Sequence, residues 1–204
     1  MIEIDRNKKL KDLFLQSCDK ANVVLACRVS PKQKADIVNM VRQQYKDKTT
    51  LAIGDGANDV NMITAAHVGV GIAGKEGQQA ARSADFVIGQ FQFLKNLMFV
   101  HGREAYRRNA YTVCYIFYKN AIFVLPQYWF GFLSVFSGQT LYEAWIYQLY
   151  NIVFTAIPIM WFALFDFEKP KEKFLAKPKY YSIGLNSECF SIDIFWRWII
   201  YGAW

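Results

Sequence analysis

Cysteine is scarce in this sequence, and its cysteines lie far apart. The 204 residues include four of them, and no two form a Cys-x-x-Cys pair. Zinc sites and disulfide frameworks need closely or regularly spaced cysteines, so the sequence favours neither. The simpler interpretation is reduced, buried thiols in a protein that faces the cytosol. The four residues are Cys18, Cys27, Cys114 and Cys189.

Internal repeats, low-complexity tracts and a secretory signal peptide are also absent from the sequence. Residues 1–11 are strongly charged, whereas a signal peptide needs an apolar run. The formal net charge is +7, a sign that many nucleic-acid-binding proteins share. Much of this charge flanks long apolar runs, a pattern typical of the cytosolic ends of membrane spans, so we expect no nucleic-acid partner. The flanking residues are Arg103, Arg107, Arg108, Lys169, Lys171, Lys173, Lys177 and Lys179.

Apolar residues are unevenly distributed along the chain. Residues 1–100 have the short apolar runs of a soluble α/β protein, whereas residues 101–204 contain runs long enough to cross a bilayer as helices. The sequence therefore predicts a soluble domain followed by a membrane domain, with a boundary near residue 100.

Short apolar runs alternate with helical patterns in the soluble part. Ser30 is a good N-cap and Pro31 a good first residue for a helix that runs to about Tyr45, and Val60–Ala66 has the pattern of a short helix. Strands that alternate with helices predict a parallel sheet covered on both faces, with ligands beyond the carboxyl ends of its strands. The predicted strands are Ala21–Cys27, Leu51–Gly54, Val68–Ile72 and Phe86–Ile88.

The strand Leu51–Gly54 leads directly into a loop that carries two carboxylates. Asp55 and Asp59 are four residues apart, and Gly54 and Gly56 flank the first of them. The glycines let the backbone turn tightly and approach a ligand closely. Mg²⁺ binds through one or two carboxylates and completes its shell with water and phosphate oxygens. The loop therefore predicts a Mg²⁺ site.

Basic residues close to this loop in the predicted fold are candidates for binding phosphate. Lys34 falls in the first turn of its helix, where the helix dipole does not favour a cation. A phosphate nearby would explain the position, and a solvated surface lysine is the alternative. A separate glycine group is assigned to tight turns and close packing, because it lacks the context of a nucleotide fingerprint. It comprises Gly69, Gly71, Gly74 and Gly77.

Three runs together resemble the phosphorylation domain of P-type ATPases, which has a haloacid-dehalogenase-like α/β fold. They are residues 28–34 (Arg-Val-Ser-Pro-Lys-Gln-Lys), the loop from Gly54 to Asp59, and residues 69–72 (Gly-Val-Gly-Ile). Two further runs resemble the phospholipid-transporting branch of that family, the flippases. These are residues 60–62 (Val-Asn-Met) and residues 74–80 (Gly-Lys-Glu-Gly-Gln-Gln-Ala).

The resemblance implies roles for five residues, with Mg²⁺ as cofactor and ATP as substrate. Asp55 would coordinate Mg²⁺, and Asp59 would be a second ligand or support the first. Lys34 would neutralise the transferring phosphoryl group. Asn58 and Arg28 would contact phosphate or nucleotide. Phosphoryl transfer is catalysed largely by positioning and charge stabilisation, which agrees with this set of side chains.

The aspartate that such enzymes phosphorylate lies in an Asp-Lys-Thr-Gly-Thr motif, which this sequence does not contain. The nucleotide-binding and actuator domains of such enzymes have no counterpart in this sequence either. We therefore expect the chain to be the C-terminal part of a longer enzyme, or a truncated gene product, and to be inactive alone. Its first partner would be the N-terminal part of the same enzyme, and flippases commonly pair with an accessory subunit as well.

The membrane part has three apolar stretches. Spans are predicted at about residues 112–136 and 141–165, and a third begins at about residue 191. Basic flanks predict a hairpin whose two ends are cytosolic. Residues 93–124 contain no proline and are predicted to form one long helix.

Polar residues within the spans are candidates for a lipid headgroup path. Lys119 is roughly 10 Å from the cytosolic start of its span by helical rise, where a cation needs a cavity, a partner, or room to snorkel. Asn151 precedes Pro158 in the second span, and a simple interhelical hydrogen bond is the alternative role for it. The flippase resemblance favours Lys119, Asn120 and Asn151 as parts of the path of a phospholipid substrate.

Carboxylates are nearly absent from the spans, with Glu143 the only one in the two complete spans. Cation pumps of this family resemblance would be expected to carry several, so the sequence favours lipid transport. The alternatives are a P-type ATPase with another cargo and a non-catalytic truncated membrane protein. A soluble phosphatase of the haloacid dehalogenase fold is disfavoured by the membrane spans.

Overall fold

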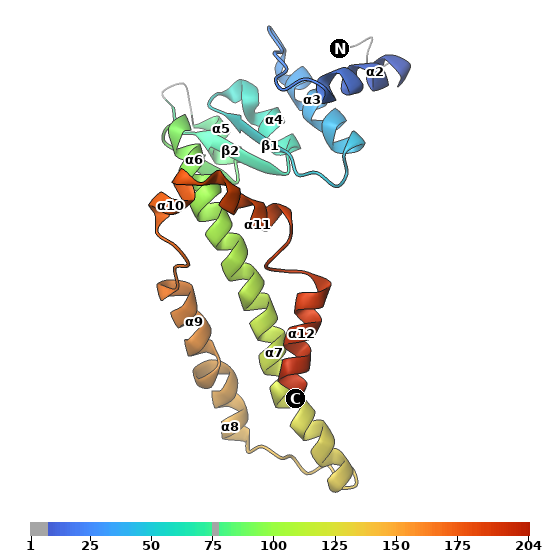
Figure 1. Cartoon of the computed structure of the whole chain (residues 1–204), viewed down its shortest axis with the longest axis vertical. Coiled ribbons are helices and arrows are strands. Elements are labelled where there is room, and N and C mark those ends of the chain that lie inside the picture. The colour runs from blue at the N-terminus through green and yellow to red at the C-terminus, as the bar shows by residue number, and fades with distance from the viewer. Residues whose placement is uncertain (1–7, 75–77) are drawn as a thin grey trace. The chain divides into compact units, whose positions relative to one another are not determined.

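The structure is a computed structural model that describes residues 8–74 and 78–204 (Figure 1). Two segments used in the sequence analysis lie partly outside the described residues. They are the charged N-terminal run, at residues 1–7, and the second glycine-rich run, at residues 75–77. The chain divides into two compact units, Met1–Leu94 and Lys95–Trp204.

A three-stranded parallel sheet forms the centre of the first unit. Its strands are β1 (Leu51–Gly54), β2 (Val68–Ile72) and β3 (Phe86–Ile88), in that order across the sheet. Ile53 of β1 pairs with Val70 of β2, and β3 continues the same parallel register. The predicted parallel sheet and these three strands are confirmed.

The helices of the first unit are α2 (Lys8–Asp19), α3 (Pro31–Gln44), α4 (Val60–Ala65) and α5 (Gln79–Ser83). Ser30 caps α3 as predicted, because its side chain accepts a hydrogen bond from the Gln33 backbone while the Gln33 side chain accepts one from the Ser30 backbone. The two predicted helices are therefore confirmed to within one residue.

Glycine lets helices approach one face of the sheet closely. A Cβ at Gly69 would lie 2.6 Å from Cγ2 of Ile63 in α4, and one at Gly71 would lie 2.7 Å from the Ala81 Cα in α5. The assignment of these two glycines to close packing is confirmed. Nothing lies within 4 Å of a Cβ at Gly74, so packing does not require that glycine.

Two predictions about the sheet need correction. The predicted strand Ala21–Cys27 is wrong, because the segment is irregular and Leu25 is 86% exposed. A strand exists only through hydrogen bonds to a neighbour, and β1 is an edge of the described sheet. Coverage of both faces is also incomplete, since Leu51 and Phe86, on the face opposite the close-packed glycines, are 41% and 50% exposed.

The cysteines also differ from expectation. All four are free, but only Cys114 is buried, whereas Cys27 is exposed and Cys18 and Cys189 are half-buried. Cys27 is exposed because it belongs to the segment that does not join the sheet. Burial raises the pKa of the Cys189 thiol, so this thiol is protonated at neutral pH.

The second unit is helical. Helical residues run from α6 (Leu94–Asn96) through a wide π-helical turn (Leu97–Gly102) into α7 (Arg103–Leu133), so the long helix predicted for this region is present with one irregular turn. A second helical stretch follows, and α12 packs along α7, where Gly202 lets the Tyr118 carbonyl approach closely. The remaining elements are α8 (Ala144–Leu149), a π-helical turn (Tyr150–Phe154), α9 (Ala156–Phe165), α10 (Lys171–Ala176), a 3-10 turn (Pro178–Tyr181), α11 (Ser182–Leu185) and α12 (Ile192–Ala203).

Within the described residues, one helical stretch is long and apolar enough to cross a membrane, Ala144–Phe165. It falls inside the predicted second span, at residues 141–165. The first predicted span coincides with α7 up to Leu133, where the helix ends, and the third with α12. Those two spans stay predictions, since Lys119 and several tyrosines lower the apolar character of α7, and α12 has only 12 residues.

Candidate functional site

Two charged side chains of the first unit form an ion pair. Lys34 Nζ donates to Asp59 Oδ1 at 2.7 Å, although the residues are 25 apart in sequence. Asp59 is only 8% exposed, so the contact replaces much of its hydration. A freely solvated surface lysine, the alternative considered for Lys34, is therefore excluded.

The packing of α3 on α4 brings this pair together. Lys34 lies in the first turn of α3 and reaches Asp59 just before α4, while Arg42 in the last turn of α3 donates to the Ala65 carbonyl at the end of α4. The two helices are thus held at both ends, which fixes where the Lys34 ammonium lies.

Gly54 fixes the position of Asp59. A Cβ at residue 54 would lie 2.3 Å from the Asp59 Cβ and 2.7 Å from its Oδ2. Any other residue would displace the carboxylate, so the glycine before Asp55 serves the site through packing. The sequence predicted a need for glycine here, but not which atom approaches it.

Lys34, Asp55 and Asp59 line one cavity of about 480 Å³ at the carboxyl end of β1. Its other walls are largely apolar and include Ile53 and Met62. Asp55 is exposed there, as expected for a group that meets a ligand from solution. The structure therefore brings together three of the five residues singled out for phosphate chemistry.

Arg28 and Asn58 do not line this cavity. Asn58 is exposed in the 3-10 turn Ala57–Asp59, one residue from the Asp59 carboxylate. Arg28 is exposed in the irregular segment before α3 and has a backbone φ of 54°, in the left-handed region that few non-glycine residues adopt. Their predicted contacts with phosphate or nucleotide stay predictions.

The carboxylates fit a magnesium ion and do not fit a site made wholly of protein ligands. Among the described residues, no group of three or more histidine, cysteine, aspartate or glutamate side chains is placed to hold a metal. Mg²⁺ needs only one or two carboxylates beside water and phosphate. Lys34 already balances the charge of Asp59, which leaves Asp55 as the carboxylate available for direct coordination.

A second polar cluster lies between α7 and the helical stretch 144–165. Lys119 Nζ donates to Asn151 Oδ1 at 3.2 Å and to Thr155 Oγ1 at 3.1 Å. Lys119 thus has side-chain partners rather than snorkelling to an interface. Asn120, predicted to join it, is exposed and makes no recorded contact with this cluster.

Three residues of this cluster were missed by sequence reasoning. Tyr150 donates from its hydroxyl to the Lys119 carbonyl at 2.8 Å, and Tyr115 donates to the Thr155 carbonyl at 3.0 Å. Thr155 is buried and ends the π-helical turn Tyr150–Phe154. The sequence did contain a signal for the helix break at Thr155. Pro158 lies three residues later, in the first turn of α9, where proline is favourable.

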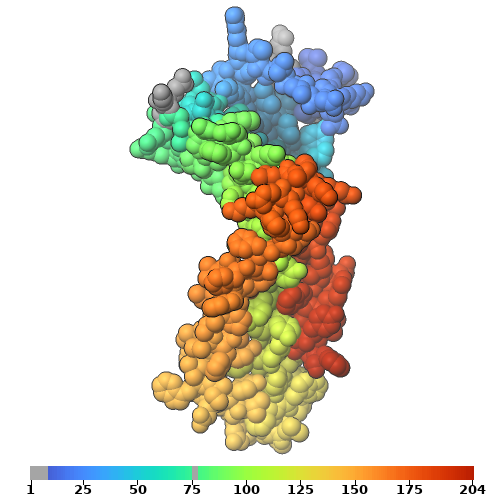
Figure 2. Space-filling view, turned by 60° about the vertical axis from the view of Figure 1, so that its left-hand side comes forward, coloured from blue at the N-terminus to red at the C-terminus, as the bar shows by residue number. Residues whose placement is uncertain are grey.

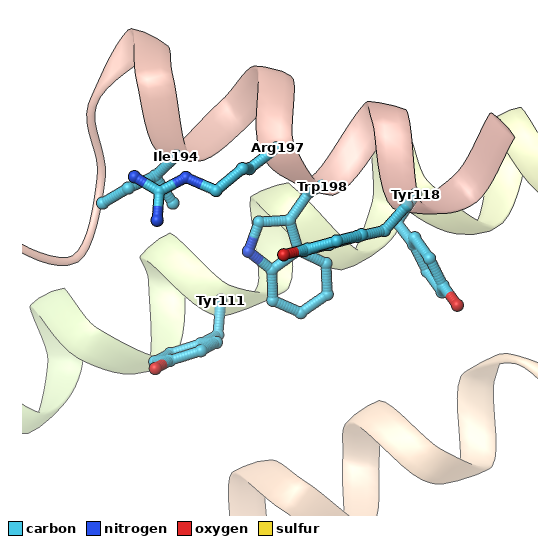
Figure 3. Close-up of a pocket in the computed structure, with 6 residues that line it drawn as sticks. Tyr111, Tyr118, Ile194, Arg197 and Trp198 are labelled. Atoms are coloured by element: carbon cyan, nitrogen blue, oxygen red, sulfur yellow. The ribbon is translucent and has the colours of Figure 1, made fainter. Parts of the chain in front are cut away.

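Another cavity lies between α7 and α12 (Figure 3). It has a volume of about 530 Å³, and Trp198 packs edge-on against Tyr111 and Tyr118 within it. Arg197 lies near Ile194 along the same groove. No residue predicted for catalysis or for the lipid path lines this cavity, so we assign neither role to it.

The basic residues in the first turns of α7 do more than flank a predicted span. Arg103 is 3% exposed, and it donates to Glu168 at 2.7 Å, to Glu104 at 3.2 Å and to the Tyr180 carbonyl at 3.0 Å. Arg107 pairs with Asp166 and lies within ion-pair distance of Glu104. This network ties α7 to the segment after α9, and Figure 2 shows the orange atoms around α10 against the green chain that precedes α7.

The network shifts two pKa values. Burial alone would raise the pKa of Glu168, but hydrogen bonds from Arg103 and Lys169 outweigh it and lower that pKa. Burial likewise disfavours the charge of Arg107, yet its hydrogen bond to Asp166 and the nearby carboxylates raise its pKa. Both groups are therefore charged at neutral pH, and oppositely charged neighbours shift the pKa of each.

Comparison with known families agrees with both units. Residues 10–91 match haloacid dehalogenase-like hydrolases, as the small parallel sheet predicts, and residues 81–204 match the C-terminal domain of phospholipid-translocating P-type ATPases. The chain belongs to the phospholipid-translocating P-type ATPase family. The resemblance inferred from the motifs is thereby confirmed.

Relatives within this ATPase family match nearly the whole chain. Phospholipid-transporting ATPase DRS2 of Saccharomyces cerevisiae is 46% identical over 194 residues, which is 95% of this chain and 14% of that protein. Phospholipid-transporting ATPase ID of Homo sapiens is 47% identical over 171 residues, which is 84% of this chain and 14% of that protein. The chain therefore spans about one seventh of the length of these P-type ATPases.

Proposed function

We propose that this chain works within a longer ATP-driven phospholipid translocase, where it supplies the metal and phosphate ligands and part of the lipid path. The observation that carries the catalytic half is the cavity at the end of β1, where Lys34, Asp55 and Asp59 meet. The similarity to phospholipid-transporting ATPases supports the cargo.

In the catalytic half, Asp55 would hold Mg²⁺, and the ion would supply charge neutralisation for the phosphates of ATP. Asp59 holds the Lys34 ammonium at the rim of the cavity, where it stabilises negative charge that develops on a transferring phosphoryl group. The chain contains no Asp-Lys-Thr-Gly-Thr motif. We therefore assign the phosphorylated aspartate to the part of the enzyme that this chain does not span.

In the membrane half, residues 112–136 and 141–165 cross the bilayer with both outer flanks in the cytosol. A cation within a span costs about 3 kcal/mol on insertion scales, which hydrogen-bonding partners reduce. Asn151 and Thr155 are such partners for Lys119, but they carry no charge. The Lys119 ammonium therefore stays available to the anionic headgroup of a phospholipid that moves toward the cytosolic leaflet.

The whole enzyme in proteoliposomes tests this proposal. Lys119→Met should lower lipid-stimulated ATP turnover while phosphorylation by ATP persists, and Asp55→Asn should abolish Mg²⁺-dependent phosphorylation itself. Unchanged lipid stimulation in Lys119→Met would contradict the lipid path, and unchanged Mg²⁺-dependent phosphorylation in Asp55→Asn would contradict the catalytic role. Stimulation by a monovalent or divalent ion in place of lipid would instead support a P-type ATPase with another cargo.

A further inference from the structure

A separate charged cavity lies within the second unit, at the start of α7. Its volume is about 440 Å³. Glu104 and Arg108 line it from α7, Phe167 and Lys169 from the segment after α9, and Lys171 and Phe174 from α10. It shares no lining residue with the cavity at the end of β1 or with the Lys119 cluster.

The negative charges around this cavity are already paired. Glu104 and Glu168 both contact Arg103, and Asp166 pairs with Arg107. Lys169 also contacts Glu168, at 3.1 Å, and lies over the Tyr180 ring. Arg103, which is buried, and Arg107, which is half-buried, therefore pair with these acidic side chains and leave little negative charge for the other basic groups, although Glu104 Oε2 makes no hydrogen bond.

Among the described residues that line the cavity, Arg108 and Lys171 are basic and form no ion pair with this network. Arg108 stacks over Phe167 and donates to the Asp166 backbone carbonyl at 3.3 Å, but its Nε is buried without a hydrogen-bond partner. Lys171 is exposed, and among the described residues no ion pair or hydrogen bond is recorded for it. A buried guanidinium donor without an acceptor is costly, and an anion that accepts from it would remove that cost.

The walls of the cavity indicate what kind of anion fits. Guanidinium groups recognise phosphate oxygens well, because two N–H donors can point at two oxygens. Phe167 and Phe174 add apolar surface beside the basic groups. Arg108 precedes the predicted first span by four residues, and Phe167 follows the second by two, so the cavity would face lipid headgroups of the cytosolic leaflet.

From these contacts we propose that the cavity binds a phosphate ester through Arg108 and Lys171. This site is distinct from the proposed lipid path, since Arg108 and Lys119 are about 16 Å apart along α7 by helical rise. The inference rests on the paired and unpaired charges of the second unit, and it does not depend on the proposed transport of lipid.

Lipid binding by the whole enzyme tests the site. The enzyme is placed in phosphatidylcholine nanodiscs with a small fraction of phosphatidic acid, and native mass spectrometry measures the phosphatidic acid that stays bound. Arg108→Gln and Lys171→Gln should each retain about tenfold less, as expected for loss of one charge-assisted hydrogen bond. Lys173→Gln, an exposed neighbour in α10 that does not line the cavity, should match the parent chain.

A second arm of the experiment identifies the source of the phosphate. Inorganic phosphate that displaces the bound phosphatidic acid completely would assign the site to a soluble phosphate, whereas weak competition would assign it to a lipid headgroup. Because Lys171 is exposed, its variant stays informative even if Arg108→Gln disturbs packing.

Three results would overturn the site. Retention could be unchanged in both variants, or Lys173→Gln could lose as much as Lys171→Gln, which would indicate only general attraction to positive charge. Alternatively, Lys119→Met could remove the binding, in which case the lipid occupies the proposed lipid path and the transport proposal survives without this site.

Discussion

Lys34 in the first unit and Lys119 in the second have opposite electrostatic surroundings. Lys34 pairs with the carboxylate of Asp59, so their charges cancel and the exposed Asp55 leaves the cavity negative. Lys119 is held by the neutral oxygens of Asn151 and Thr155, so its positive charge stays uncompensated. By these charges we expect the first arrangement to favour a metal cation and the second to favour an anion, although both use one lysine and hydrogen-bonding oxygens.

Removing the Lys34 ammonium should have the largest effect on activity of the changes considered for the two sites. Lys34→Met in the whole enzyme should lower the rate of phosphorylation by ATP roughly 10²–10³-fold, the usual cost of losing one charge-stabilising donor. Lys32→Met is the matched control, because Lys32 is an exposed lysine of the same helical turn. Rapid-quench measurement of the phosphoenzyme checks the prediction, and equal rates in the two variants would contradict it.

Crowding the Asp59 carboxylate should break the first site without removing a charge. Gly54→Ala places a Cβ 2.3 Å from that of Asp59, so we expect a loss of about 1–3 kcal/mol in stability together with impaired phosphorylation. Gly74→Ala meets nothing within 4 Å and should be nearly neutral. Thermal unfolding midpoints of the purified proteins compare the two, and an unchanged midpoint for Gly54→Ala would show that the loop yields easily.

Changing Lys119 should affect the second site alone. Lys119→Met should reduce lipid-stimulated turnover by about tenfold, the cost of one charged hydrogen bond, and should leave phosphorylation by ATP near normal. Asn120→Ala tests the neighbouring residue, which is exposed and outside the cluster, and should change little. A larger loss in Asn120→Ala than in Lys119→Met would assign the lipid contact to the other face of α7.

Acid should weaken the arginine network by a small amount. Arg103 and Lys169 lower the pKa of Glu168, so its stabilising contribution is complete above the ordinary glutamate pKa of 4.5 and is lost as the pH falls through the lower folded value. Solvent screening limits the contribution to about 1 kcal/mol or less. We therefore compare thermal unfolding midpoints at neutral pH and at a pH below 4.5. The midpoint should fall more for the parent chain than for Glu168→Gln.

Exposed Glu172 provides the control for that measurement. Glu172→Gln, in α10, should keep the full pH dependence of the parent chain, because Glu172 is exposed and forms no recorded ion pair among the described residues. If Glu168→Gln keeps the same pH dependence as well, the acid sensitivity comes from another carboxylate of the network.

Local pattern predicted the elements well where the signal is complete within a few residues. The Ser30 cap, the helix after it and the three strands of the sheet all depend on neighbouring residues, and all are present. The segment Ala21–Cys27 has the composition of a strand but not its structure, since a strand is defined by a partner that composition does not reveal.

The sequence by itself determined the family, the three strands of the sheet with the helices α3 and α4, and the types of side chain available for metal and phosphate. Only the tertiary structure decided which of these meet: Lys34 with Asp59 across 25 residues, and Lys119 with Thr155 across 36. It also showed that Arg103 and Arg107 are paired with the carboxylates of Glu168 and Asp166, while the Nε of Arg108 has no partner. Local propensity acts over a few residues, whereas charge pairing depends on how distant helices pack, and that packing decides which charges stay free for a ligand.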